Sequence, residues 1–79
     1  MDEFDDFYRD RAAAMRRYAV ALVGPVDADD SCQEAWSRIW RAWDEADPER
    51  RDAWAFRIVR NCCIDRRRRA KPVAELEEW

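Results

Sequence analysis

The 79-residue sequence has no histidine, no threonine and one glycine. Ser31 and Ser37 supply its only aliphatic hydroxyl groups. Without an imidazole base beside a serine or cysteine, and without a glycine-rich phosphate loop, the usual catalytic constellations cannot be assembled. We therefore expect a protein that is not an enzyme, with no cofactor and no small-molecule substrate.

Cysteine is also scarce, at three residues, and the spacing contains no C-x-x-C pair. An odd set of thiols with no histidine to complete it argues against a structural zinc site. Cys32 and Cys62 fall on the apolar sides of expected helices, which indicates buried, reduced thiols. Redox sensing is the alternative.

No stretch of about 18 apolar residues is present, so the sequence predicts no membrane-spanning helix and no membrane partner. The chain begins with an acidic segment, whereas a secretory signal begins with basic and then apolar residues. We expect a cytoplasmic protein. Its length suits one compact domain with one modest core.

Apolar residues make up 48% of the chain and charged residues 42%, a mixture typical of amphipathic helices. Apolar side chains recur at spacings of three and four in three stretches, 3–23, 28–43 and 53–69. The pattern predicts an all-α fold, a compact three-helix domain.

The expected boundaries follow from helix-stop and helix-start residues. Gly24 and Pro25 should end the first helix, and Asp27 should cap the second. The 44–53 connection is polar, contains Pro48 and has room for a short extra helical turn. Residues 1–71 then form the domain, and residues 72–79 begin an interdomain linker.

Charge is distributed unevenly along the chain. Residues 1–48 contain 12 acidic and 6 basic side chains, whereas residues 49–71 contain 3 and 9. Three glutamates follow in residues 72–79. A polyanionic partner is therefore plausible only for the C-terminal third, and the acidic remainder should face protein or solvent.

Helical periodicity places polar residues together on two helix faces. On the second helix, opposite its tryptophan stripe, these are Asp30, Gln33, Glu34, Ser37 and Arg41. On the third helix the shared face holds Arg57, Arg60, Asn61, Ile64, Arg67 and Arg68. Ordinary solvation of both faces is the alternative interpretation.

Two long strings resemble a known family. The segments DADDSCQEAWSRIWRAWDEADPERRDAW, residues 27–54, and WAFRIVRNCCIDRRRR, residues 54–69, resemble conserved region 2 of the extracytoplasmic-function sigma factors. Residues 3–23 also fit, so the resemblance covers essentially the whole chain. Ser31 and Cys32 depart from it, because the family usually has larger aliphatic residues there.

The resemblance implies two partners, core RNA polymerase and promoter DNA. The clamp coiled coil of the polymerase beta-prime subunit would bind the exposed side of the second helix, at Asp30, Gln33, Glu34, Ser37 and Arg38. The non-template strand of the −10 element, with one base unstacked, would bind the loop at Asp47, Pro48, Glu49, Arg50, Arg51, Asp52 and Ala53, and the third helix at Arg57, Arg60, Asn61 and Asp65. Arg67 joins this set through its place on the cationic face. An anti-sigma factor is a further expected partner.

Three alternatives stay open at this point. Trp54 could contact DNA or belong to the core. The chain could act as a stand-alone interaction module that binds an anti-sigma factor or polymerase without productive promoter reading. A helix-turn-helix repressor is the weaker option, because no short glycine-containing turn precedes the third helix.

Overall fold

The computed structural model describes residues 2–70, and all of its regular elements are helical. In chain order they are α1 (Glu3–Arg41), the 3-10 turns η1 (Trp43–Glu45) and η2 (Pro48–Arg50), and α2 (Arg51–Ala70). The predicted all-α class is confirmed. The two turns lie in the connection where one extra turn was expected. The 72–79 segment lies outside the described residues.

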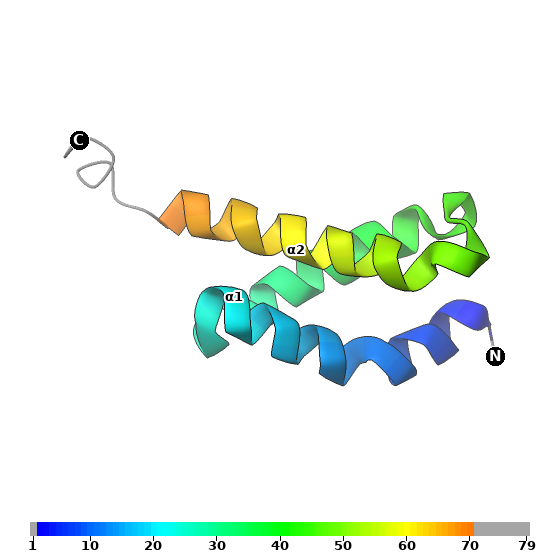
Figure 1. The fold of residues 1–79 in the computed structure, drawn as a ribbon, viewed down its shortest axis with the longest axis horizontal. Coiled ribbons are helices and arrows are strands. Elements are labelled where there is room, and N and C mark those ends of the chain that lie inside the picture. The colour runs from blue at the N-terminus through cyan, green and yellow to red at the C-terminus, as the bar shows by residue number, and fades with distance from the viewer. Residues whose placement is uncertain (1, 71–79) are drawn as a thin grey trace.

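Helix α1 is sharply kinked at Gly24, where φ is 84° and ψ is 165°. A residue with a Cβ atom rarely adopts this backbone conformation, whereas glycine adopts it at little cost. Residues 3–23, the first arm, and residues 25–41, the second arm, fold back on each other as two antiparallel rods, with α2 packed alongside (Figure 1). The predicted count of three separate helices is not confirmed, because α1 spans both arms.

Three predicted boundaries were wrong. Asp27 lies inside α1 and does not cap a helix, because helical structure resumes at Pro25, whose fixed φ suits a first helical turn. The second arm ends at Arg41, where residue 43 was expected. Helix α2 begins at residue 51, two residues earlier than expected, because η2 leads directly into it. Pro48 starts η2, and the Asp47 carboxylate caps it by accepting a hydrogen bond of 3.0 Å from the Glu49 amide.

Small side chains dominate the core and let the three rods approach closely. Its buried members are Met15, Ala19, Ala28, Ala35, Ile39, Ala55, Val59, Cys62 and Cys63. Near the N-terminus the packing is aromatic instead: Phe4 makes edge contacts with Trp36 at 5.9 Å and with Trp43 at 5.4 Å between ring centroids. The first turn of α1 thus supports the connection that precedes α2.

All three cysteines are free thiols. Cys62 is buried as predicted, whereas Cys32 is only half-buried. Burial raises the pKa of Cys62 to about 11, and it also raises the pKa of Cys32 and of Cys63. These thiols are therefore protonated and poorly nucleophilic near neutral pH.

Within residues 2–70 no helix is long and apolar enough to cross a membrane. The same residues contain no group of three or more metal-ligating side chains placed to hold an ion.

Candidate functional site

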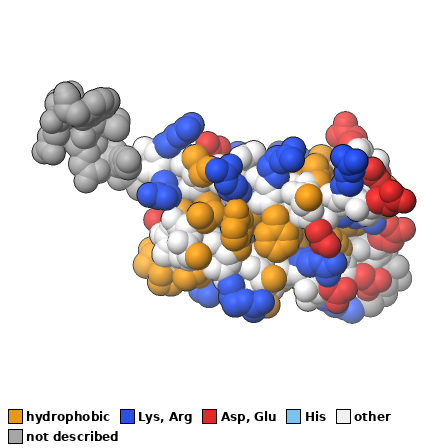
Figure 2. Space-filling model, viewed as in Figure 1, with side chains coloured by type: hydrophobic (Ala, Val, Ile, Leu, Met, Phe, Trp, Pro, Cys, Tyr) orange, Lys and Arg blue, Asp and Glu red, His pale blue; other side chains and the backbone are white. Residues whose placement is uncertain are grey.

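The arginines from η2 to the end of α2 fall into two groups. Arg51, Arg66 and Arg69 form ion pairs with acidic residues of α1. The others are exposed, and their side chains make no hydrogen bond or ion pair with any residue from 2 to 70: Arg50, Arg57, Arg60, Arg67 and Arg68. Figure 2 shows cationic side chains spaced along the edge of the molecule that α2 forms. These unpaired cations, the free arginine stripe, are available to an external anion.

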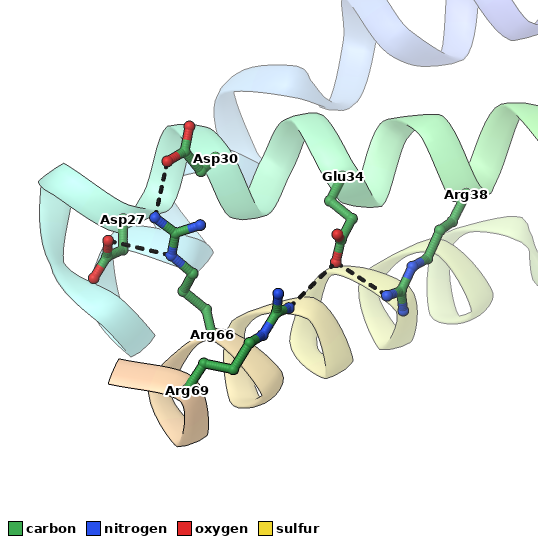
Figure 3. A network of polar contacts seen from close by, with 6 residues as sticks. All are labelled: Asp27, Asp30, Glu34, Arg38, Arg66 and Arg69. Carbon is green, nitrogen blue, oxygen red and sulfur yellow. Dashed lines mark hydrogen bonds and ion pairs between the residues drawn. The ribbon is translucent and has the colours of Figure 1, made fainter. Parts of the chain in front are cut away.

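The paired arginines near the end of α2 join it to the second arm (Figure 3). The Arg66 guanidinium lies 2.9 Å from an Asp30 carboxylate oxygen and 3.4 Å from one of Asp27. Glu34 accepts a hydrogen bond of 3.0 Å from Arg38, and Arg69 lies 3.8 Å from the same oxygen. The side chains of these pairs are 33–65% exposed to solvent, so each pair stabilises the fold by less than about 1 kcal/mol.

This network divides the predicted polymerase-binding set. Asp30, Glu34 and Arg38 belong to the network with α2, whereas the side chains of Gln33 and Ser37 are exposed and have no partner among the described residues. The division follows from helix geometry. Asp30, Glu34 and Arg38 are four residues apart and form one row along the helix, whereas Gln33 and Ser37 form the neighbouring row.

The expected tryptophan stripe of the second arm is not fully buried. Trp40 is 57% exposed. Trp36 lines an open groove of about 490 Å³ between the two arms, together with Tyr8 and Gln33. This aromatic groove was not predicted, because the tryptophan stripe of the second arm was expected to face the core.

The start of α2 is tied to the first arm by two further arginine contacts. Arg51 donates to Glu3 at 2.6 Å, and its guanidinium lies 4.1 Å from the centre of the Trp43 ring. Arg11 donates to both carboxylate oxygens of Asp52, at 2.6 and 3.2 Å. The hydrogen bond from Arg11 lowers the pKa of Asp52. Arg51 and Asp52, predicted to contact DNA, are thus engaged within the chain.

A second pocket, of about 300 Å³, opens where the connection meets α2 and is called the loop pocket here. Its lining residues are Glu45, Ala46, Asp47, Arg50, Ala53, Trp54 and Arg57. Four of them were predicted to bind DNA. The half-buried Trp54 lines the pocket, and its ring also lies 6.4 Å from the ring of Trp43, so it packs within the domain and borders a surface cavity. Glu45 and Ala46 were not predicted, because they precede residues 47–53, the loop positions that the resemblance assigned to DNA.

The remaining predicted DNA-binding residues lie outside the pocket. Pro48 and Glu49 are exposed on η2, and Asn61 is exposed on α2 next to Arg60. Asp65 is half-buried.

The arrangement suits a flexible polyanion with flat aromatic groups. An indole ring can stack on a base, and guanidinium groups can neutralise phosphates and stack as well. The free arginine stripe begins at the loop pocket with Arg50 and Arg57 and continues along α2. One strand could therefore contact the pocket and the stripe together.

Comparison with known proteins identifies relatives over most of the chain. The family model described as Sigma-70 region 2 matches residues 4–73. In three strains of Mycobacterium tuberculosis, the ECF RNA polymerase sigma factor SigL is 41% identical over 69 residues, covering 81% of this chain. The alignment covers 38% of those relatives, so the chain spans well under half of their length. No solved structure matches the chain.

Proposed function

This chain belongs to the sigma-70 family as the region 2 domain of an extracytoplasmic-function sigma factor, and we propose that it binds core RNA polymerase and the single-stranded −10 element during transcription initiation. The observation that carries the DNA half of this proposal is the free arginine stripe leading away from the loop pocket. Such a domain is an initiation module rather than an enzyme.

In this proposal the loop pocket holds one unstacked base of the non-template strand. Trp54 supplies the stacking surface, and Asp47 and Glu45 supply acceptors for base-edge donors. Unstacking a base costs a few kcal/mol, which the pocket contacts must offset. Arg57, Arg60 and Arg67 bind the neighbouring phosphates, and Asn61 can donate to or accept from a base edge.

The polymerase half of the proposal uses the second arm of α1. The beta-prime clamp coiled coil binds its exposed side, where the side chains of Gln33 and Ser37 have no competing partner among the described residues. Asp30, Glu34 and Arg38 bind polymerase beside them, after charged groups of polymerase partly replace their ion-pair partners within the chain. Substituting Gln33 and Ser37 tests this contact without disturbing α2, unlike substituting Asp30 or Glu34.

A loop exchange tests the base-reading role. Residues 45–50 would be replaced by those of a relative with a different −10 preference, leaving Arg51 and Asp52 in place. We expect the preference to transfer while affinity for the beta-prime coiled coil stays constant, as measured by −10 selection and by titration. A chimera that kept its original preference would place base reading elsewhere on α2.

One observation favours a second function, a protein-interaction module that binds an anti-sigma factor. The aromatic groove and the 57% exposed Trp40 leave a binding surface for a protein side chain or helix. Single-stranded DNA binding separates the two functions. A module of this second kind would show no base preference at low salt, whereas a promoter-reading domain would show one.

A further inference from the structure

Two contacts hold the pocket-forming segment against the first arm. They join Arg51 to Glu3 and Asp52 to Arg11, residues separated by 48 and 41 positions in sequence. Arg51 and Asp52 stand directly between Arg50 and Ala53, which line the loop pocket. Because successive helical residues point about 100° apart, the segment can face the pocket with one set of side chains and the first arm with the other.

Both contacts are more constrained than ordinary surface ion pairs. The Arg51 side chain is only 19% exposed, lies over the Trp43 ring at 4.1 Å and has a buried Nε atom without a hydrogen-bond partner within the described residues. Arg11 binds both oxygens of Asp52, a bidentate geometry that fixes orientation as well as distance. Together they fix where α2 begins relative to η1.

We propose that Glu3 and Arg11 are positioning residues for base recognition, acting through Arg51 and Asp52 to hold the loop pocket in its binding shape. This inference rests on the proposed function, in which the pocket receives an unstacked base. Holding the segment in place before DNA binds lowers the entropy cost of ordering it on binding. A fixed pocket also discriminates better between bases, because a loose pocket adapts its shape to any base.

The proposal changes the role of two predicted DNA-binding residues. Arg51 and Asp52 direct their charged groups to α1, so they serve the pocket without contacting DNA. Arg11 lies on α1 and does not line the pocket. Substituting it should therefore alter base preference only if the Arg11–Asp52 contact positions the pocket.

The experiment measures binding of the full 79-residue chain, together with a beta-prime coiled-coil fragment, to four labelled non-template oligonucleotides. They differ in the base at the unstacked position of the −10 element. The variants are Arg11→Gln, Asp52→Asn and the double variant. The control Arg17→Gln removes the same charge from an exposed residue of the first arm that has no ion pair within residues 2–70.

We expect Arg11→Gln and Asp52→Asn each to reduce the ratio of best to worst affinity by about fivefold or more, the usual lower range for coupled sites. The double variant should lose no more than either single variant, because both act through one contact. Arg17→Gln should keep the wild-type ratio. Arg11→Lys, which retains the charge but not the bidentate geometry, should give an intermediate ratio.

Three outcomes would overturn the inference. If the affinity ratio stays at the wild-type value in Arg11→Gln but falls in Asp52→Asn, Asp52 contacts DNA directly. If the fold-reduction of the affinity ratio in the double variant equals the product of the two single-variant reductions, the residues act independently. If the wild-type chain shows no base preference, the proposed base pocket itself fails, and this result is distinct from the other two. Thermal unfolding of each variant verifies that it is folded.

Discussion

At the scale of single residues, the structure decides which charged side chains are available and which are already engaged. Arg60 and Arg66 belong to the same helix and have the same chemistry. Arg60 is exposed and unpaired among the described residues, whereas Arg66 contacts Asp27 and Asp30. Sequence periodicity counted Arg67 toward DNA binding and passed over Arg66, but it could not identify an ion pair as the reason.

The Arg11–Asp52 contact predicts a measurable titration. The hydrogen bond from Arg11 lowers the folded-state pKa of Asp52, so the contact stabilises the fold above the ordinary carboxyl pKa of 3.8 and is lost as pH falls through the lowered value. Carboxyl-carbon NMR should show the Asp52 pKa rising toward 3.8 in Arg11→Gln. Asp52 is 61% exposed, so the stability lost at neutral pH should be below about 1 kcal/mol. An identical Asp52 titration in both proteins would contradict the contact.

The thiols give a second prediction at this scale. With a pKa of about 11, Cys62 carries about 100-fold less thiolate at pH 8 than a thiol at the ordinary 9.0. Alkylation with iodoacetamide, followed by mass spectrometry, should therefore modify the half-buried Cys32 first and Cys62 and Cys63 far more slowly. Urea-unfolded protein is the control, in which all three should react at similar rates. Equal rates in the folded protein would contradict their burial.

At the scale of elements, Gly24 sets the fold by turning one helix into two antiparallel arms. Gly24→Ala should destabilise the domain by about 1–3 kcal/mol, because a side chain at φ 84° and ψ 165° strains the backbone. No heavy atom beyond the two adjacent residues lies within 4 Å of the added methyl group, so a clash with the rest of the fold does not contribute. Urea unfolding measures the loss.

Two controls separate strain from other causes. Val26→Ala, at a neighbouring position that is 86% exposed, should change stability by less than about 0.5 kcal/mol. A synthetic chain with D-alanine at position 24 should retain wild-type stability, because the D-residue favours positive φ. Equal losses for the L- and D-alanine chains would show that strain is not the cause.

The presence of the helices could be predicted from sequence, because it depends on local periodicity. The residues at which the helices begin and end were less predictable. Pro25 restarts the helix directly after Gly24, a pairing that looked like a simple stop. Which side of each helix faces another rod depends on packing between distant segments. The ion pair between Asp30 and Arg66 was therefore not predicted, and no local pattern could pair Glu3 with Arg51 across 48 residues.

At the scale of the whole molecule, a small net charge conceals separate acidic and basic regions. The formal net charge is −3, yet the free arginine stripe presents unpaired cations on one edge. The acidic residues of the second arm neutralise Arg66 and Arg69 and leave the stripe uncovered. Single-stranded DNA should thus approach along α2 in one orientation, with attraction that weakens as salt rises.

This partition predicts different salt dependences for two variants with the same charge. For single-stranded DNA, the slope of log affinity against log salt changes by about 0.7 for each phosphate contact. Arg60→Gln should reduce the slope by about 0.7, because Arg60 is free to bind phosphate. Arg66→Gln should leave it near the wild-type value, because Arg66 is engaged with Asp27 and Asp30. Anisotropy titrations of the 79-residue chain at several salt concentrations measure both slopes. If the Arg66 variant lost as much slope as the Arg60 variant, the ion pairs of Figure 3 would open on DNA binding, and the stripe would extend across the end of α2.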